Sequence, residues 1–321
     1  MIRYLSESDV RELLTMDDAI AQVERAFRAR ATGRAFDVPR VRTRQPGGHL
    51  HILQGAAPEI NFIGYKAYYI QPDKSRTSLL QLINMEQGNL EAIIQADWLG
   101  QIRTGAATAV AIRMLARNGS RVLGLFGSGR HAQTQLEAVC AVCDISEVKV
   151  FGRDQQRVRD FCAKMAAQTG VEVRPATSRQ ETVEGSDIVL TITRSREALF
   201  DGAWLEPGQC VVAVGSNAMD RQEIDLQTVR RADLIVADSV QVAQTESGDL
   251  LSAYESGLIY WENLPDLGQV LVGQRAGRTN EDQIILFESH GMALQDIYAG
   301  AHILELARSA GLGQDFPIGA R

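Results

Sequence analysis

The stretch that decides the fold is RVLGLFGSGRHAQTQ, residues 121–135. A short apolar run leads into Gly127, Ser128 and Gly129, and Ala132 follows at the start of a helical pattern. In this GxGxxA spacing the first glycine permits a tight turn, the second lets the backbone approach a pyrophosphate, and the small residue lets helix and strand pack closely. The N–H groups of the helix N-terminus favour phosphate. The stretch therefore predicts a dinucleotide-binding loop, and a tight turn that binds no nucleotide is the alternative.

The chain after this loop alternates between strand and helix patterns. Short apolar runs at EVKVFG, SDIVLTIT, QCVVAVGS and ADLIVADS are separated by helical segments. Runs of this length with helices between them are typical of a parallel sheet that is covered on both faces. We therefore expect an α/β domain here.

The end of the second expected strand bears on the choice of dinucleotide. In NAD-binding domains an acidic side chain at this point binds the ribose 2′-hydroxyl. The segment EVKVFGRD instead places Gly152 and Arg153 there, and a guanidinium suits a 2′-phosphate, so NADP(H) is favoured over NAD(H). Asp154 follows, and it becomes the ribose ligand if the strand ends one or two residues later.

The first third of the chain has a different pattern. Residues 9–33 carry apolar positions at helical spacing and stop at Gly33, which predicts one helix. From about residue 38 to 96, short strand patterns alternate with Pro and Gly, and MEQGNLEAII is typical of a hairpin. We expect a mostly antiparallel sheet after the helix, and a final amphipathic helix that ends near Gly311.

A charged residue interrupts the strand pattern FIGYKAYYI, residues 62–70. Alternation places Lys66 on one face with Gly64 and Tyr68. Desolvating an ammonium without a partner is costly, so its position needs a reason. Lys66 either guards an edge strand against aggregation or serves a ligand that approaches at the glycine.

Two other cations are candidates for binding an anionic substrate. Arg42 alternates with Arg40 and Arg44, although a solvated edge strand would look the same. Arg103 precedes the small-residue segment TGAATAVA, so we expect packed surroundings to hold it in place. If the second half of the chain binds a nicotinamide, the first half should present the substrate.

The overall composition excludes several classes. The chain has 321 residues, 45% hydrophobic and 23% charged, as in a globular protein of one large or two medium domains. A formal charge of −7 without a long basic run argues against nucleic acid as a partner. We see no membrane-spanning run and no signal peptide, so we expect a cytoplasmic protein. Cys140 and Cys143 form a CxxC late in an expected helix, without a second ligand pair at zinc spacing, so we expect no metal site.

These residues lie in blocks that resemble the ornithine cyclodeaminase and mu-crystallin family, which also includes alanine dehydrogenases and ketimine reductases. Seven blocks occur in the family's order nearly from end to end: PRVRT, GYKAYY, IRTGAATAVA, GLFGSGRHAQTQ, VAVGSNAMDRQEID, DSVQVAQTESGDL and FESHGMALQD. The resemblance implies a Rossmann NAD(P)-binding domain over residues 116–297. It also implies a discontinuous α+β domain, residues 1–115 with 298–321, that binds substrate and pairs into a homodimer.

The resemblance assigns roles to individual residues. Arg42, Lys66 and Arg103 would surround a small α-imino or α-amino acid and take its carboxylate. The two histidines are placed by their position in the chain: His290, where the family commonly has an apolar or amide residue, would meet the substrate, the nicotinamide or only a backbone carbonyl, and His131 would touch the pyrophosphate or have a capping or surface role. The remaining cofactor neighbours would be Thr104, Gly127, Ser128, Gly129, Ala132, Gln133, Gly152, Arg153, Thr191, Thr193, Val214, Gly215, Ser289 and Gly291.

The loop GSNAMDRQEID departs from the family's cyclodeaminases and archaeal alanine dehydrogenases. Those proteins carry an aspartate at the position of Asn217 that engages the substrate's amino group, whereas mu-crystallin, a ketimine reductase, also lacks it. An amide cannot offset the charge of an ammonium or accept its proton. Asp220 could substitute, though the loop would aim it elsewhere. We expect a neutral or conjugated substrate nitrogen, with Lys66, Arg103 and Asn217 as the catalytic residues.

The expected activity is therefore an NAD(P)H-dependent reduction of a small cyclic ketimine carboxylate, such as 1-pyrroline-2-carboxylate or 1-piperideine-2-carboxylate, to the L-amino acid. Lys66 or a water that it holds would protonate the nitrogen. The alternatives are ornithine cyclodeaminase, which converts ornithine to proline and ammonia, an enzyme like alanine dehydrogenase, and a binding protein without activity.

Overall fold

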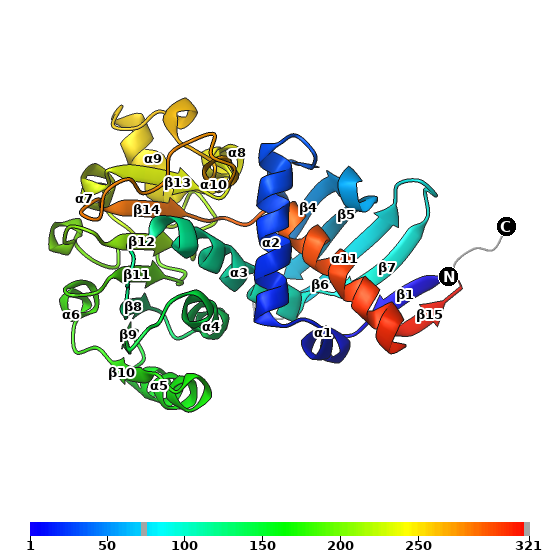
Figure 1. The fold of residues 1–321 in the computed structure, drawn as a ribbon, viewed down its shortest axis with the longest axis horizontal. Coiled ribbons are helices and arrows are strands. Elements are labelled where there is room, and N and C mark those ends of the chain that lie inside the picture. The colour runs from blue at the N-terminus through cyan, green and yellow to red at the C-terminus, as the bar shows by residue number, and fades with distance from the viewer. Residues whose placement is uncertain (72–75, 318–321) are drawn as a thin grey trace. The chain divides into compact units, whose positions relative to one another are not determined.

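The structure, a computed structural model, describes residues 1–71 and 76–317. The chain divides into two compact units (Figure 1): unit 1 is Met1–Ala106 with Gly291–Arg321, and unit 2 is Ala107–His290. The arrangement is discontinuous, as expected, but the boundaries lie elsewhere. The first falls inside helix α3, Asp97–Leu115, and the second precedes helix α11, Ala293–Ala310, so the last helix lies wholly in unit 1.

Unit 1 is a mixed sheet with helices. Its strands follow the order β15-β1-β7-β6-β5-β4-β2, and β3 pairs with β4. The pair β1–β7 is parallel and the other pairs are antiparallel, as the sequence led us to expect. The elements before α3 are β1 Ile2–Leu5, α1 Glu7–Leu13, α2 Met16–Ala31, β2 Phe36–Asp37, β3 Val41–Gln45, β4 Gly48–Ala57, η1 Pro58–Ile60, β5 Phe62–Ile70, β6 Arg76–Asn84 and β7 Leu90–Gln95; β15, Gln314–Phe316, follows α11.

The N-terminal helix prediction is wrong in one respect. Residues 9–33 do not form a single helix, because the backbone is extended at Leu14 and a new helix begins after Thr15. The Thr15 hydroxyl accepts a hydrogen bond from the backbone N–H of Asp18, and the Asp18 carboxylate accepts one from the backbone N–H of Thr15. This capping box fixes a helix start. The predicted end is confirmed, since Gly33 has a φ of +71°. Within the described ranges, no helix combines the length and hydropathy needed to cross a membrane.

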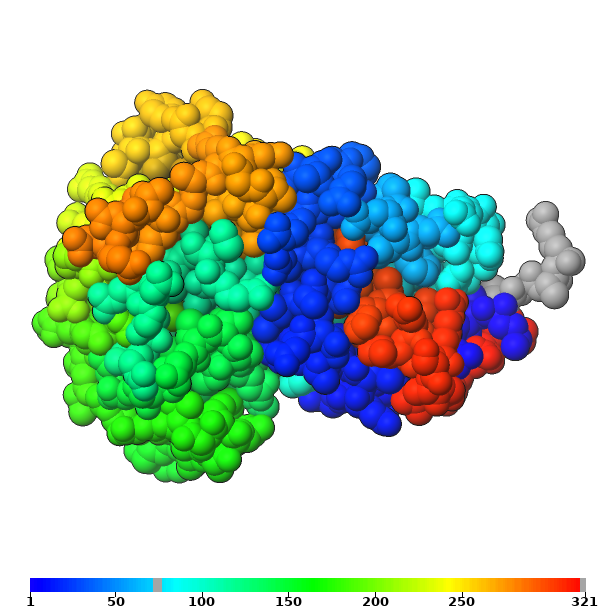
Figure 2. Space-filling model, viewed as in Figure 1, coloured from blue at the N-terminus to red at the C-terminus, as the bar shows by residue number. Residues whose placement is uncertain are grey.

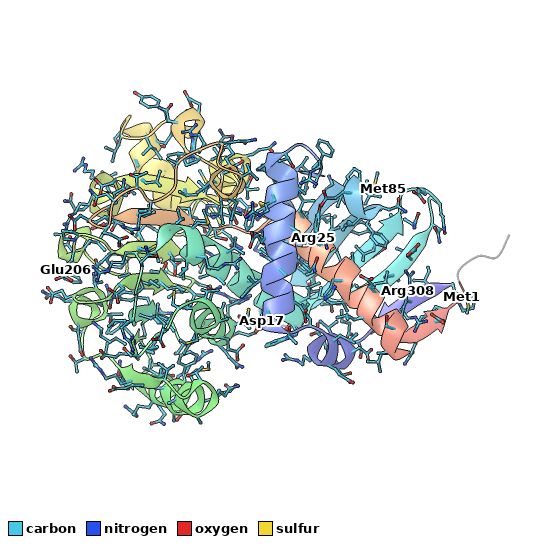
Figure 3. All side chains as sticks on the ribbon, in the orientation of Figure 1. Met1, Asp17, Arg25, Met85, Glu206 and Arg308 are labelled. Atoms are coloured by element: carbon cyan, nitrogen blue, oxygen red, sulfur yellow. The ribbon has the colours of Figure 1, made fainter. Side chains whose placement is uncertain are left out.

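Helix α11 covers one face of the unit 1 sheet and lies beside α2 (Figure 2). A row of aligned residues crosses β4, β5, β6 and β7 on this face: Leu53, Lys66, Leu80 and Ile94. A Cβ built on Gly300 of α11 would lie 2.3 Å from a methyl of Leu80, so helix and sheet are in close contact. At its C-terminal end, Arg308, labelled in Figure 3, donates to Glu91 of β7 at 2.7 Å.

Unit 2 is a seven-stranded parallel sheet in the order β10-β9-β8-β11-β12-β14-β13, with helices in the connections. This confirms the predicted α/β domain. Its elements are β8 Val122–Phe126, α4 Ala132–Val142, β9 Glu147–Phe151, α5 Gln155–Thr169, β10 Glu172–Pro175, α6 Arg179–Val183, β11 Ile188–Thr191, η2 Gly202–Trp204, β12 Cys210–Ala213, α7 Leu226–Arg231, β13 Leu234–Ala237, α8 Val240–Glu246, α9 Gly248–Glu255, η3 Trp261–Asn263, α10 Leu267–Leu271 and β14 Ile285–Glu288.

The CxxC pair lies at the end of α4, as predicted. Cys140 is in the last turn and Cys143 is the C-cap residue. Burial raises the pKa of Cys140 to about 11 and also raises that of Cys143. Both thiols are therefore protonated at neutral pH, which is the unreactive form.

The stability of unit 2 depends on a glycine inside β8. A Cβ on Gly124 would lie 1.9 Å from the carbonyl oxygen of Thr182 at the end of α6. We expect Gly124→Ala to lower the free energy of unfolding by about 1–3 kcal/mol, because strand and helix backbones must separate. Thermal unfolding measures the change. Gly129→Ala is the control, since no protein atom lies within 4 Å of a Cβ there; equal melting temperatures of the two variants would contradict the assignment.

Candidate functional site

The buried cation of β5 pairs with a carboxylate of the chain itself. Lys66 is 4% exposed, and its Nζ donates to both oxygens of Asp296 at 2.6 and 2.7 Å. Asp296 is fully buried in the first turn of α11, 230 residues further along the chain. Lys66 therefore has a counter-ion within the protein itself, in addition to any anion that a substrate would bring. Asp296 could not be recognised from the sequence, because acidic residues are common in the first turn of helices.

The edge-strand explanation of Lys66 is wrong. Strand β5 lies between β4 and β6, so the lysine does not guard a sheet edge. Gly64 also has a reason within the protein, since a Cβ there would lie 2.5 Å from the carbonyl oxygen of Gln81. The glycine therefore reflects close contact of strand backbones and does not by itself mark a ligand.

Arg103 joins the same ion pair. Its Nε donates to Asp296 Oδ1 at 3.2 Å and its Nη1 donates to Gln295 at 2.8 Å. The side chain is buried, which confirms that packed surroundings hold it in place. Gly291 has a φ of +84°, and a Cβ there would lie 2.7 Å from Arg103 Nη1, so this glycine makes room for the guanidinium. We call Lys66, Asp296 and Arg103 the triad.

The start of α3 packs against the triad. A Cβ on Gly100 would lie 3.7 Å from Lys66 Nζ. Thr104 donates its hydroxyl to the carbonyl of Gly100 at 2.7 Å. This hydroxyl is thus used within the helix, and the role of Thr104 toward a cofactor stays a prediction.

The triad carries an excess of positive charge when both cations are protonated, since two cations share one carboxylate. Burial and the nearby charge of Arg103 together lower the pKa of Lys66 to about 7, although Asp296 opposes both effects. Lys66 therefore exchanges its proton near neutral pH. Removing two cations from water is costly, and a second anion would compensate the remaining charge.

Arg42 lies further away than the other two predicted substrate ligands. It belongs to β3, which pairs with β4. The register places it opposite His51, which in turn is opposite Tyr68. Arg42 is therefore two strands from β5 and aligns with the residue two positions beyond Lys66. Its contact with a substrate carboxylate stays a prediction.

The phosphate loop of unit 2 has the predicted geometry. Gly127 has a φ of +117°, and a Cβ there would lie 2.7 Å from the carbonyl oxygen of Ile192, so only glycine fits without strain. Gly129 differs, because the space around its Cα is open. Ala132 is fully buried at the start of α4. The protein's own backbone therefore requires glycine at Gly127 and leaves open space at Gly129. Open space at the second glycine is what the close approach of a dinucleotide's pyrophosphate needs.

Three polar residues of the loop have partners within unit 2. The carbonyl of Ser128 accepts a hydrogen bond from Arg157 Nε at 3.2 Å. His131 occupies the N-cap position of α4, where its carbonyl accepts from the Thr134 hydroxyl at 3.1 Å, but its side chain makes no capping hydrogen bond. Gln133 donates to Glu137 at 2.8 Å and accepts from Lys164 at 2.7 Å. Contacts of their side chains with a cofactor stay predictions.

Strand β9 ends at Phe151, as expected, so Gly152 and Arg153 follow it directly. The carboxylate of Asp154 caps α5 and accepts from the N–H of Arg157 at 3.1 Å, which weakens its case as the ribose ligand. Arg157 was not predicted from the sequence, although it lies three residues after Asp154, the N-cap residue of α5. Arg153 and Arg157 are both exposed, and Arg157 contacts the loop at Ser128.

A buried carboxylate connects the loops that follow β11 and β12. Glu223 accepts hydrogen bonds from the hydroxyls of Thr191 and Thr193 at 2.9 and 2.6 Å, and from Gly215 N–H at 2.7 Å. A Cβ on Gly215 would lie 2.3 Å from the Thr193 nitrogen, so the two loops are in contact. Burial raises the pKa of Glu223 to about 7. Val214 precedes Gly215 directly after β12. Glu223 thus holds the predicted cofactor neighbours Thr191, Thr193 and Gly215 in place through hydrogen bonds. The sequence did not indicate this role of Glu223.

The segment after β14 is also held by a buried carboxylate. Asp238 accepts from the hydroxyl of Ser289 at 2.8 Å and from the N–H of His290 at 2.9 Å. The His290 ring places Nδ1 3.0 Å from the carbonyl of Ser216 and Nε2 3.6 Å from Glu288. Burial raises the pKa of Glu288 well above its usual value. His290 thus contacts a backbone carbonyl, one of its three predicted roles, and its meeting with substrate stays a prediction.

The loop that departs from the family pattern gives Asp220 another partner. Asp220 has 60% of its side chain exposed and pairs with Arg196 at 3.2 Å. Asn217 is partly buried and accepts from Arg221 at 3.4 Å. This agrees with the expectation that the loop aims Asp220 away, and it leaves Asn217 as the predicted substrate neighbour.

The contacts of the triad lead us to predict the pH at which Lys66 titrates. Of the four lysines in the chain, Lys66 should titrate with a midpoint near pH 7, because burial and Arg103 disfavour its ammonium form. The Cε NMR signals of lysine, assigned by loss in Lys66→Arg, measure it. In Asp296→Asn the midpoint should move to lower pH, since the carboxylate raises this pKa. A Lys66 signal unchanged up to pH 9 would contradict the predicted pKa.

The open space at Gly129 leads us to predict how a methyl group there changes nucleotide affinity. Gly129→Ala should keep the melting temperature of the free protein and weaken NADH or NADPH binding about tenfold or more, because the methyl would occupy room needed by the pyrophosphate. Nucleotide fluorescence titration measures the affinity. Gly170→Ala, in the αL cap of α5 away from the loop, is the control that should bind normally. Unchanged affinity in Gly129→Ala would place the phosphates elsewhere.

The comparisons with known proteins agree with this geometry. The pattern of the ornithine cyclodeaminase/mu-crystallin family matches residues 3–311. The chain is similar to the Delta(1)-pyrroline-2-carboxylate reductase of Thermococcus litoralis, solved with NADH and L-proline, at 29% identity and a TM-score of 0.94 over 98% of this chain and 100% of that one. It is similar to an archaeal alanine dehydrogenase dimer with bound NAD, at 29% identity and a TM-score of 0.93 over 99% of each chain.

A third solved structure is similar to this chain over 99% of both chains. It is the iminosuccinate reductase of Paracoccus denitrificans in complex with NAD⁺, with 25% identity and a TM-score of 0.93. These likenesses confirm the expected α/β fold with a Rossmann-type domain and the expected class, an oxidoreductase of imino or amino acids. The chain belongs to the ornithine cyclodeaminase/mu-crystallin family.

Proposed function

We propose that this chain uses NAD(P)H to reduce a small cyclic ketimine carboxylate, such as 1-pyrroline-2-carboxylate or 1-piperideine-2-carboxylate, to the L-amino acid. The observation that carries the proposal is the triad. Two buried cations share the carboxylate of Asp296, and one of them exchanges a proton near neutral pH. Such a group suits a substrate that needs both a partner for its carboxylate and a proton for its nitrogen.

The carboxylate of the substrate is the first requirement. Arg103 has its Nε and Nη1 engaged by Asp296 and Gln295, and its planar fork offers further N–H donors to a carboxylate. Both partners come from the first turn of α11, so the guanidinium is held in one orientation. Holding the acid in a fixed position lowers the barrier without a covalent step.

The proton is the second requirement. When bound, the reduced nicotinamide supplies hydride to the C=N carbon. Lys66 Nζ, held by both oxygens of Asp296, gives its proton to the imine nitrogen or to a water that passes it on. A pKa near 7 lets the same amine recover its proton from solvent between turnovers.

Asn217 favours an imine over a diamine. Its amide accepts a hydrogen bond but does not compensate the charge of an ammonium. Asp220 lies in an exposed pair with Arg196, so its charge is already partly compensated. A cyclic imine, which has no second amine, is therefore a better match for this site than ornithine.

The cofactor preference and the assembly are parts of the same proposal. Exposed Arg153 and Arg157 favour the 2′-phosphate of NADP(H), whereas the three solved relatives contain NADH, NAD or NAD⁺, so NAD(H) is the alternative.

We also propose a homodimer. On the sheet face opposite the triad, several apolar side chains are partly or fully exposed and suit a second copy: Leu50, Ile52, Ile63, Leu79, Ile83 and Ile93.

The experiment follows oxidation of NADPH and NADH by the purified protein with each cyclic imine. We expect steady oxidation whose rate falls as the pH rises through about 7, because the ammonium form of Lys66 is lost. Lys66→Met should lower kcat about a hundredfold or more, as for loss of a general acid. Arg308→Met, an exposed cation on α11, is the control that should retain full activity.

Two results would give another function. Ammonia release from ornithine without net nicotinamide consumption would make the protein a cyclodeaminase. Reduction of pyruvate with ammonium in preference to the cyclic imines would make it similar in activity to alanine dehydrogenase.

A further inference from the structure

A neutral side chain makes the shorter of the two hydrogen bonds that hold Arg103. Gln295 Oε1 accepts from Arg103 Nη1 at 2.8 Å, whereas Asp296 Oδ1 accepts from Arg103 Nε at 3.2 Å. Gln295 is fully buried and directly precedes Asp296 in the first turn of α11. Two consecutive residues of one helical turn therefore hold the guanidinium, one with a charge and one without.

The orientation of the Gln295 amide follows from its neighbours. The backbone N–H of Met292 donates to the same Oε1 atom at 3.4 Å. Because both neighbours are donors, the oxygen of the amide must face them and the nitrogen must not. Gln295 Nε2 has no hydrogen-bond partner among residues 1–71 and 76–317, and a buried donor without a partner is unfavourable.

A carboxylate of the same shape would satisfy this position better than the amide does. The two oxygens of a glutamate would accept from Arg103 and Met292 without burying an unmatched donor. A glutamate would also compensate the positive charge that remains when Lys66 and Arg103 share one carboxylate. The amide does neither. Its effect is to fix the guanidinium of Arg103 and to leave the charge in place.

This charge acts on the amine of Lys66. Burial, Arg103 and Arg40 lower the pKa of the amine, and Asp296 raises it. The residues aligned with Lys66 on the adjacent strands β4 and β6 are both leucines, so these positions add no charge. Arg103 and Lys66 donate to the same atom, Asp296 Oδ1, at 3.2 and 2.6 Å, so guanidinium and ammonium are direct neighbours. A charge added beside Arg103 should therefore change the protonation of Lys66.

We propose that Gln295 is a positioning residue, whose neutral amide orients Arg103 and preserves the guanidinium charge that acts on Lys66 and on the substrate carboxylate. This inference rests on the proposed reduction of an imine and deepens it. Gln295 exchanges no proton itself and acts through Arg103. By leaving the guanidinium charge uncompensated, it lets the Lys66 amine both release and recover a proton near neutral pH.

The first variant, Gln295→Glu, keeps the acceptor for Arg103 and adds a negative charge. The titration midpoint of Lys66, followed by its Cε NMR signal, should rise by about one pH unit or more, because the new carboxylate favours the ammonium form. The loss of imine reduction at rising pH should move to higher pH by the same amount. Gln314→Glu, which adds the same charge on the exposed strand β15, is the matched control that should move neither.

The second variant, Gln295→Met, keeps the side chain neutral and removes the acceptor. The Lys66 midpoint should stay within about 0.3 pH units, because the guanidinium charge is unchanged. KM for the cyclic imine should rise about tenfold, with kcat within about twofold, because Arg103 loses its shorter contact and binds the substrate carboxylate in a less fixed position. Gln314→Met is the control that should keep both kinetic constants.

The two variants separate a positioning role from a merely structural one. A residue that only stabilises α11 would lower the melting temperature in both variants and leave the Lys66 midpoint unchanged in both. An unchanged midpoint in Gln295→Glu, or an unchanged KM in Gln295→Met, would overturn the inference. If no imine is reduced, the proposed function fails, and the NMR midpoints, which need no turnover, alone support or overturn the role of Gln295.

Discussion

The ion pair between Lys66 and Asp296 is the interaction on which unit 1 depends. It joins a strand from the first third of the chain to the helix near its end, with both oxygens of the carboxylate within 2.7 Å of one ammonium. A buried ion pair of this kind contributes little to stability relative to apolar packing, but removing one partner leaves an uncompensated charge. In the proposed function its value is therefore chemical. It keeps a basic amine and a guanidinium in fixed positions in a buried site, where each interacts more strongly with an arriving anion.

Unit 2 uses buried carboxylates in a different way. Glu223 and Asp238 do not face cations in the contacts described above. They accept hydrogen bonds from the hydroxyls and N–H groups of the loops that follow parallel strands. Ligands of parallel sheets bind at this carboxyl edge, so rigid loops there favour a well-defined cofactor site. Thr191, Thr193 and Ser289 were predicted as cofactor neighbours, and in the structure their hydroxyls serve this bracing.

The sequence predicted what depends on local pattern. The phosphate loop, the strand around Lys66, the hairpin at Gly88 and the helix ends at Gly33 and Gly311 follow from short-range preferences for backbone conformation, and the structure confirms them. The missed features depend on contacts between distant segments. Asp296 and Glu223 resemble ordinary acidic residues in the sequence. Only folding brings Asp296 to Lys66 and Glu223 to Thr191. The break before α2 was missed because the capping box at Thr15 competes with a continuous apolar pattern, and sequence periodicity does not resolve that competition.

The discontinuous path of unit 1 has a consequence for synthesis on the ribosome. Lys66 emerges from the exit tunnel long before Asp296, which follows 230 residues later. During that interval the nascent sheet lacks both the helix that covers its apolar face and the counter-ion of its buried amine. Unit 2 is contiguous and is completed first, so it can fold while the earlier segment waits. The protein is thus expected to mature from its middle outward, and the ion pair of Lys66 with Asp296 forms only after the last helix has been synthesised.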